Sequence, residues 1–164
     1  PELLRAAFSL VPDYLATEEA EVTNLMDLGF QLGRRFRALK LWMVLRAYGA
    51  EGLRRRIREH CRLARRLADR LAAEPFFELV APVPFSTVCF RGVHGEELDR
   101  RLLAAVNADG RFFLSHTVLA GRFTLRVAIG NLGTAERHVD ALADLLVERA
   151  GTLAADDTAS EERR

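Results

Sequence analysis

The sequence predicts an α+β protein in which two long helices are followed by a small antiparallel sheet with further helices. Apolar residues recur at helical spacing between residues 34 and 73, and the pattern changes to alternation after Pro75. The predicted order is then strand, strand, helix, strand, strand, helix, which is typical of a small antiparallel sheet. With a net charge of +1 and 49% hydrophobic residues, the chain is globular and has no bulk attraction to nucleic acid or membranes.

The first 30 residues are predicted to be mainly loop. Residues 1–8 could end a helix or strand, and Pro12 favours extended geometry at the residue before it. Residues 14–23, YLATEEAEVT, show no clean apolar period, and loops of this length are often functional or mobile. The chain opens without methionine inside an amphipathic pattern, so we expect it to be the later part of a longer protein.

Two helices follow. The first, from residue 34 to a stop at Gly49, is expected to bury an apolar stripe against a domain or partner outside this chain. That stripe consists of Phe36, Leu39, Trp42, Met43 and Tyr48. The second helix, residues 51–73, has a predicted buried stripe of Leu53, Ile57, Ala64, Leu67 and Leu71. Its many arginines are interrupted by acidic residues and lack interleaved aromatics, so they indicate a solvated face and not a nucleic-acid site.

The remaining elements alternate between strand and helix patterns. Strands are predicted at residues 77–81, 87–93, 112–118 and 123–129, and a short helix at residues 96–108. Thr134 is a plausible N-cap for a last helix that ends near Ala150 and buries Val139, Leu142, Leu145 and Leu146. The final polar residues are predicted to be disordered.

The sequence shows no strong signature of the usual catalytic or metal sites. The four histidines, His60, His94, His116 and His138, are scattered over different predicted elements and form no metal-ligand pair. Cys61 and Cys89 are too few and too far apart for a disulfide framework or a metal site, which favours a reducing, cytoplasmic location. The sequence shows neither a nucleophile elbow nor a phosphate-binding glycine loop, and no apolar run is long enough for a membrane span.

One block carries a family resemblance. QLGRRFRALKLWMVLRAYG at residues 31–49, with MDLGF before it and GLRRRIREH after it, resembles the pyridoxal-phosphate-dependent group II amino-acid decarboxylases. The aromatic-L-amino-acid branch is the most similar. PDYL at residues 12–15, VCFR at 88–91 and LRVAI at 125–129 resemble further family motifs in the same order. The resemblance covers roughly residues 1–150.

The resemblance implies the C-terminal part of a fold-type I, pyridoxal-phosphate-dependent lyase. Residues 1–32 would be the end of the large domain and a mobile catalytic loop, and residues 33–74 would be long helices linking to the small domain. Residues 75–152 would form the small α+β domain, and residues 153–164 a disordered tail.

The resemblance also implies residue roles. Tyr14 resembles the loop tyrosine that protonates the substrate carbon after carbon dioxide leaves. Leu32 and Gly33 resemble residues that line the substrate pocket of the neighbouring subunit in a homodimer, and the glycine leaves room for an aromatic amino acid. The lysine that binds pyridoxal phosphate is expected upstream, because Lys40 resembles a non-catalytic lysine of the family. We therefore expect no cofactor-binding residue and no metal site in this chain, and no activity from the chain alone.

Two alternatives stay open. The parent protein could act on another amino acid, such as histidine or glutamate, or be a deaminating relative. The second alternative is a function that is not enzymatic. Residues 1–150 could fold alone as a regulatory or dimerisation α+β module, with the arginine-rich helix as its contact surface.

Overall fold

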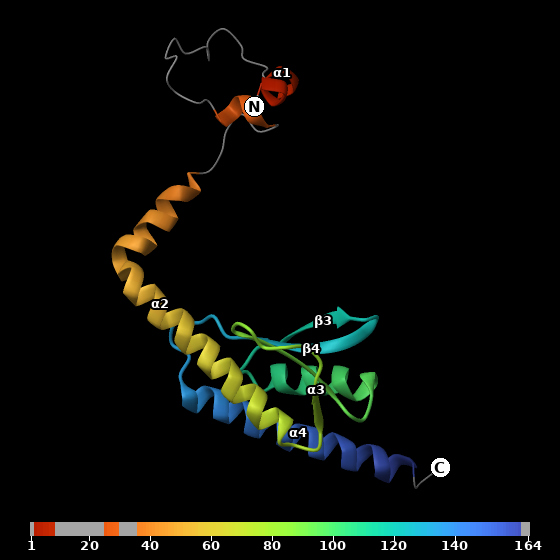
Figure 1. Ribbon diagram of the computed structural model, residues 1–164. Coiled ribbons are helices and arrows are strands. Elements are labelled where there is room, and N and C mark those ends of the chain that lie inside the picture. The colour runs from red at the N-terminus through yellow and green to blue at the C-terminus, as the bar shows by residue number, and fades with distance from the viewer. Residues whose placement is uncertain (1, 9–24, 30–35, 162–164) are drawn as a thin grey trace. The chain divides into compact units, whose positions relative to one another are not determined.

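The computed structural model describes residues 2–8, 25–29 and 36–161. Packing divides the chain into two units, Pro1–Gly49 and Ala50–Arg164, which we consider separately. The helices are α1 (Glu2–Phe8), the 3-10 helix η2 (Leu25–Leu28), α2 (Arg37–Ala72), α3 (Glu96–Ala108) and α4 (Glu136–Glu161). The strands are β1 (Phe77–Leu79), β2 (Thr87–Gly92), β3 (Ser115–Leu119) and β4 (Arg122–Ala128), as labelled in Figure 1.

Helix α2 contains the boundary between the units. Gly49 has φ 64° and ψ 170°, a backbone conformation that is almost restricted to glycine. The predicted stop at Gly49 is thus confirmed, although helical structure resumes immediately after it. The second stretch, residues 50–72, belongs to the same compact unit as the sheet, whereas the sequence predicted residues 33–74 as a separate linking segment.

The apolar stripe of residues 36–48 is exposed in the part of the chain that the structure describes. Phe36 is 73% exposed and Trp42 is 57% exposed, and Leu39, Met43 and Tyr48 are exposed as well. The helix itself was predicted correctly. The burial of its stripe was predicted against a domain or partner outside this chain, and it stays a prediction.

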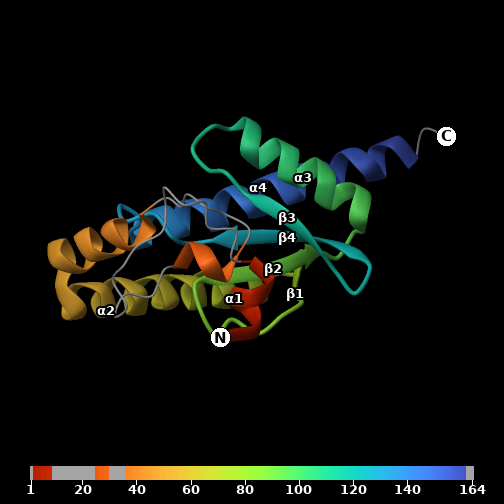
Figure 2. The ribbon, with the colours of Figure 1, turned by 90° about the horizontal axis from the view of Figure 1, so that it is seen from above.

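The second unit is built on a four-stranded antiparallel sheet in the order β1-β2-β4-β3. The apolar residues of β2 and β4 lie opposite one another, with Val88 beside Val127 and Phe90 beside Leu125. They form one core with α2, α3 and α4, and Figure 2 shows this unit from above. The predicted α+β class and the order of elements are confirmed.

The buried stripe of α2 differs in part from the predicted one. Ala64, Leu67 and Leu71 are buried as predicted, but Ile57 is exposed and Leu53 is only partly buried. Leu63 and Ala68 complete the buried face, because only the last third of α2 packs on the core.

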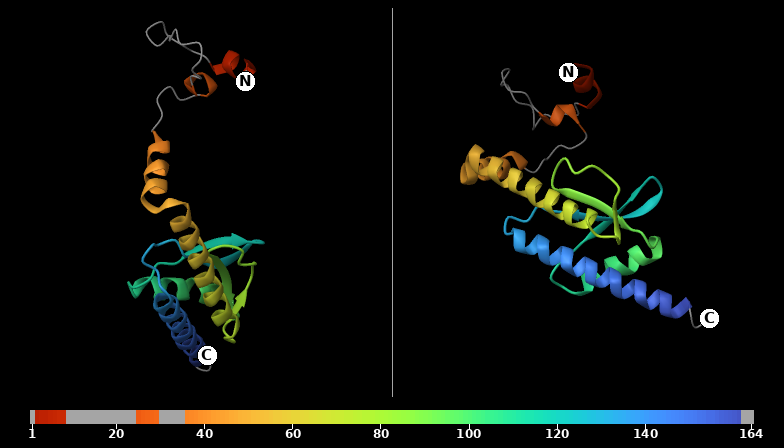
Figure 3. Two further views of the ribbon diagram at one scale, coloured as in Figure 1. Left: turned by 60° about the vertical axis from the view of Figure 1, so that its left-hand side comes forward. Right: turned by 60° about the horizontal axis from the view of Figure 1, so that its bottom comes forward.

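The second part of α2, residues 50–72, lies beside α4 (Figure 3). A ladder of ion pairs joins the two helices. Arginines spaced four apart on α2 meet carboxylates spaced four apart on α4. The pairs are Arg62–Glu136 at 3.0 Å, Arg66–Asp140 at 2.8 Å and Arg70–Asp144 at 2.7 Å. The arginine-rich face of α2 was predicted to be solvated. Arg62 is exposed as predicted and Arg66 is half-buried, but both also bind carboxylates of α4 and so help to join the two helices.

The ladder predicts a pH-dependent contribution to stability. Hydrogen bonds from Arg66 hold the pKa of Asp140 below its usual value. A carboxylate with a lowered pKa in the folded state stabilises the fold above its unfolded pKa, and this contribution is lost as the pH falls through the folded pKa. We expect Asp140→Asn to lower the free energy of unfolding at neutral pH and to flatten its decline below about pH 4. Urea unfolding at several pH values measures this, with the exposed Asp69→Asn on α2 as the control that should change neither.

Helix α4 is longer than predicted. It continues to Glu161, so the predicted end near Ala150 and the predicted disordered tail are wrong for residues 153–161. Leu153 packs partly buried against the core, and Arg101 of α3 donates a hydrogen bond to Asp157. These contacts join residues distant in sequence and hold a segment whose composition alone looks polar and unstructured.

Strand β3 begins later than predicted. The sequence predicted a strand from residue 112, but pairing with β4 starts at Ser115 opposite Arg126. The amide of Asn107 occupies the backbone of Leu114: its Nδ2 donates to the Leu114 carbonyl at 3.0 Å, and its Oδ1 accepts from the Leu114 N–H at 2.7 Å. These two bonds use the edge of the chain that faces away from β4, and residues 111–114 are not part of the sheet.

We expect Asn107→Ala to lower the free energy of unfolding by about 2 kcal/mol, because two hydrogen bonds are lost. Leu114 is 2% exposed, so water cannot easily replace them. The measurement is urea unfolding followed by circular dichroism, since the sole tryptophan, Trp42, lies in the other unit. As a control, Asn131→Ala removes one exposed hydrogen bond to the Gly133 N–H and should cost less than about 0.5 kcal/mol. Equal losses for the two variants would contradict the role of Asn107.

Candidate functional site

The three predicted site residues, Tyr14, Leu32 and Gly33, lie outside the described residues. Their roles therefore stay predictions. The described helix that follows them begins at Arg37 and presents the exposed apolar stripe. Lys40 lies on this helix between Leu39 and Leu41, and both of those leucines are exposed.

Two of the family-like motifs form the centre of the sheet. VCFR lies in β2, and LRVAI begins in β4 and ends one residue beyond it. The two segments are antiparallel neighbours, although more than 30 residues separate them in sequence. Their apolar side chains are buried, so these motifs act in the fold, and no reaction chemistry follows from them.

Arg91, the last residue of VCFR, is the most deeply buried of the described cations. It is 7% exposed. Its guanidinium donates to the Phe123 carbonyl and the Thr124 hydroxyl, both at 3.1 Å, and to the Leu119 carbonyl at 2.7 Å. The side chain therefore ties β2 to both strands of the β3–β4 hairpin. Sequence reasoning noted Arg91 only as part of a motif, although a cation inside an apolar strand is a signal of a specific role.

Asp99 of α3 binds the backbone of Gly92, the last residue of β2. Its Oδ1 accepts a hydrogen bond from the Gly92 N–H at 2.7 Å. Burial raises the pKa of Asp99, while the Gly92 hydrogen bond and the Arg91 charge act in the opposite direction. A side chain on Gly92 would come within 2.7 Å of the same oxygen, so this carboxylate requires glycine at the end of the strand.

The N-terminus of α4 is capped by the side chain of His138 and not by the predicted Thr134. The carbonyl of Ala135 accepts the first helical hydrogen bonds, so Ala135 is the N-cap residue. Its N–H donates to Nδ1 of His138 at 3.1 Å, which resembles the reciprocal bond of a capping box. His138 thus has a local structural role.

Metal and membrane sites are not found in the described ranges. Between residues 36 and 161 and in the two short described segments before them, no three His, Cys, Asp or Glu side chains gather as a metal ion would require. None of the described helices combines the length and apolarity needed to cross a bilayer.

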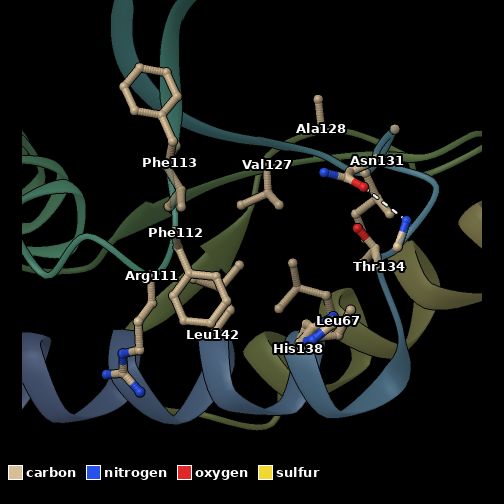
Figure 4. Close-up of a pocket in the computed structure, with 15 residues that line it drawn as sticks. Leu67, Arg111, Phe112, Phe113, Val127, Ala128, Asn131, Thr134, His138 and Leu142 are labelled. Carbon is tan, nitrogen blue, oxygen red and sulfur yellow. Dashed lines mark hydrogen bonds between the residues drawn. The ribbon is translucent and has the colours of Figure 1, made fainter.

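A pocket of about 490 Å³ opens in the second unit (Figure 4). Residues 111–114 line one side, and the end of β4 with the loop to Thr134 lines the other. Helix α4 contributes His138, Val139 and Leu142, and α2 contributes Leu67. The pocket lies where residues 111–114 fail to pair with β4.

Residues 1–93 match the family model described as the pyridoxal-dependent decarboxylase conserved domain. This chain belongs to the pyridoxal-dependent decarboxylase family. The matched range includes the predicted loop, both parts of α2 and the first two strands, and the family resemblance predicted from the sequence is confirmed.

Individual members of the pyridoxal-dependent decarboxylase family are similar over most of this chain. Tyrosine decarboxylase 2 of Arabidopsis thaliana is 49% identical over 138 residues, which are 78% of this chain and 25% of that protein. Phenylacetaldehyde synthase of Arabidopsis thaliana is 42% identical over 160 residues, which are 92% of this chain and 33% of that protein. A crystal structure of Oryza sativa TDC with PLP and tryptamine superposes with a TM-score of 0.81 at 34% identity, covering 91% of this chain and 33% of that one. The chain therefore spans a quarter to a third of the length of these relatives.

Proposed function

We propose that this chain is the C-terminal part of a pyridoxal-phosphate-dependent lyase that decarboxylates an aromatic L-amino acid. The observation that carries the proposal is the family match over residues 1–93, because it includes the segment with the predicted proton donor and pocket residues. The 49% identity to a tyrosine decarboxylase and the fold shared with a tryptamine-bound enzyme support an aromatic substrate.

The described residues do not fit a complete cofactor site. Lys40 is the only lysine in the sequence, and it lies on a helix face between exposed leucines and not in a pocket. Pyridoxal phosphate, when bound, supplies the electron sink for loss of carbon dioxide. We propose that a lysine in another part of the parent protein anchors it, and that this chain contributes groups that act on the substrate.

Tyr14 is the proposed proton donor. A phenol on a closing loop can deliver its proton to the substrate carbon in a site from which water is excluded. Protonation at that carbon gives an amine, whereas a site without the phenol leaves the carbon open to other outcomes, including oxidation.

Leu32 and Gly33 are proposed to line the substrate pocket of the partner subunit in a homodimer. The exposed stripe of residues 36–48, directly after them, supports a protein surface at this place, because so many large apolar side chains on one helix are rarely left in water. We further propose a cytoplasmic location, since Cys61 and Cys89 are both free.

A second candidate function is aldehyde formation, favoured by the 42% identity to a phenylacetaldehyde synthase. The presence of Tyr14 favours the amine-forming reaction. A third candidate, the non-enzymatic module, is favoured by the core of the second unit, whose buried cluster lies between residues 63 and 150.

Borohydride reduction followed by peptide mass spectrometry tests the cofactor part of the proposal. In the parent protein, we expect pyridoxal phosphate on a lysine outside these 164 residues and unmodified Lys40. The same treatment of the 164-residue chain alone should give no modified lysine at stoichiometric cofactor. Specific modification of Lys40 in the parent protein would contradict the assignment. Chromatography of the products then separates amine from aldehyde.

A further inference from the structure

The pocket of the second unit originates in an interrupted sheet. Strand β4 pairs with β2 as far as Ala128, but with β3 only as far as Arg126. The Ile129 N–H donates to the Ser86 carbonyl on the β2 side at 2.8 Å. Because backbone groups alternate between the two edges of a strand, the N–H and C=O of Ala128 face the opposite edge. There, Phe113 would have been the partner if β3 had continued.

Asn107 binds the other edge of the same segment. Its two hydrogen bonds go to the N–H and C=O of Leu114, which face away from β4 because these groups alternate along the chain and Phe113 is the residue in register with Ala128. The pocket therefore combines an unpaired donor and acceptor on β4 with the space left by the missing strand. This arrangement is independent of the proposed enzymatic function.

The floor of the pocket is apolar. It is made by residues that belong to the core of the unit: Leu67, Leu114, Val127, Val139 and Leu142. The ring of Phe112 forms a wall on the side opposite Thr134 and Asn131 (Figure 4). Hydrogen-bonding groups thus occur at the rim, and the interior favours a molecule with few polar atoms.

The one guanidinium that lines the pocket is paired with a carboxylate outside the lining. Arg111 is the only lining residue with a permanent charge, and Asp109 neutralises it. The two side chains form a bidentate pair, with distances of 2.5 Å and 3.1 Å. Hydrogen bonds from Arg111 also lower the pKa of Asp109, which keeps the carboxylate ionised and the pair neutral. An anion or a cation would gain little here and would lose its hydration.

We propose that this pocket binds a small, neutral, aromatic molecule that carries one hydrogen-bonding group. The volume of about 490 Å³ lies within the range of small-molecule sites. The ring would pack between Phe112 and the leucine and valine floor, and the polar group would reach Thr134, Asn131 or the backbone of Ala128.

Methyl NMR of the full 164-residue chain tests the proposal with three probes of similar size: phenol, benzoate and benzylammonium. Phenol should shift the methyl signals of Val127, Val139 and Leu142 saturably, with a Kd of about 1 mM, as expected for a ligand of this size. The methyl signals of Leu79, on β1 at the other edge of the sheet and outside the pocket lining, should stay unchanged. Benzoate and benzylammonium should bind at least about fivefold more weakly, because each must lose a charged group's hydration. Tighter binding of either ion, or shifts that do not saturate, would overturn the proposal.

Two variants locate the site. Thr134→Phe should fill the mouth of the pocket and weaken phenol binding at least about tenfold, because the added ring occupies space that phenol would take. Val118→Phe adds the same ring at an exposed position on β3 outside the pocket lining and should leave the Kd unchanged. Equal phenol affinity in the two variants would overturn the site. Shifts of the same methyl signals with protein concentration, without ligand, would instead assign the pocket to contact between two copies of the chain.

Discussion

Replacing Tyr14 with phenylalanine in the parent enzyme is expected to lower the rate of amine formation by about 10²- to 10⁴-fold, the usual contribution of a positioned general acid. The reason is that the variant keeps the ring and loses only the proton that the substrate carbon needs after carbon dioxide leaves. Substrate consumption should fall less than amine formation, because the carbon remains open to oxidation. The measurement is the ratio of amine to aldehyde product, determined by chromatography with an aromatic L-amino acid as substrate.

Tyr48→Phe is the matched control, since the chain has two tyrosines. Tyr48 lies in α2 within the exposed stripe and is not proposed to contact the substrate. Tyr48→Phe keeps the apolar ring, so this variant should form amine at close to the parental rate. An unchanged amine yield in Tyr14→Phe would remove Tyr14 from the mechanism. An equal loss in both variants would point to a general effect on folding or assembly.

Replacing Arg91 with methionine is expected to lower the free energy of unfolding by about 3–5 kcal/mol. The substitution keeps a long apolar stem but leaves the Leu119 carbonyl, the Phe123 carbonyl and the Thr124 hydroxyl without their charged donor. Arg91→Lys should be intermediate, because one ammonium group cannot reproduce the fork of a guanidinium across all three acceptors.

Urea unfolding followed by circular dichroism measures the effect of the Arg91 variants. Arg55→Met, at an exposed position on α2, is the control and should change the free energy of unfolding by less than about 0.5 kcal/mol. A loss for Arg91→Met as small as that of the control would show that water replaces the guanidinium at no cost, in which case Arg91 does not hold the hairpin.

Much of the fold could be predicted because its signals are local. The helix at residues 96–108 was predicted with the bounds it has, since apolar spacing and the Asn107–Gly110 turn mark both ends. The strands at β2 and β4 were predicted to within two residues, because alternation or an apolar run is visible in each. Gly49 was predicted as a break because few other residues tolerate its backbone angles.

The errors have non-local causes. The arginines of α2 find their carboxylates about 74 positions along the chain, so no spacing rule within α2 reveals the ladder. The first residues of the predicted third strand do not pair with β4, and an amide on α3 binds Leu114 among them. The last turns of α4 depend on contacts with α3 and the core. Each of these depends on which elements meet in three dimensions.

The candidate site was predictable only through the family resemblance. Composition and motif chemistry alone indicated a soluble α+β domain, and the residues with proposed roles on the substrate, Tyr14, Leu32 and Gly33, have no signature outside the family pattern. The role of Arg91 and the pocket beside β4 required the structure. The first depends on the position of the β3–β4 hairpin, and the second depends on where the pairing of β3 with β4 ends.

The most direct test of the central claim is release of carbon dioxide by the parent protein from carboxyl-labelled amino acids, with and without added pyridoxal phosphate. The panel contains L-tyrosine, L-tryptophan, L-phenylalanine, L-histidine and L-glutamate. Our account predicts release that depends on pyridoxal phosphate and is fastest with one of the three aromatic substrates. Faster release from histidine or glutamate would assign the protein to another branch of the family, and no cofactor-dependent release from any of the five would contradict the proposed activity.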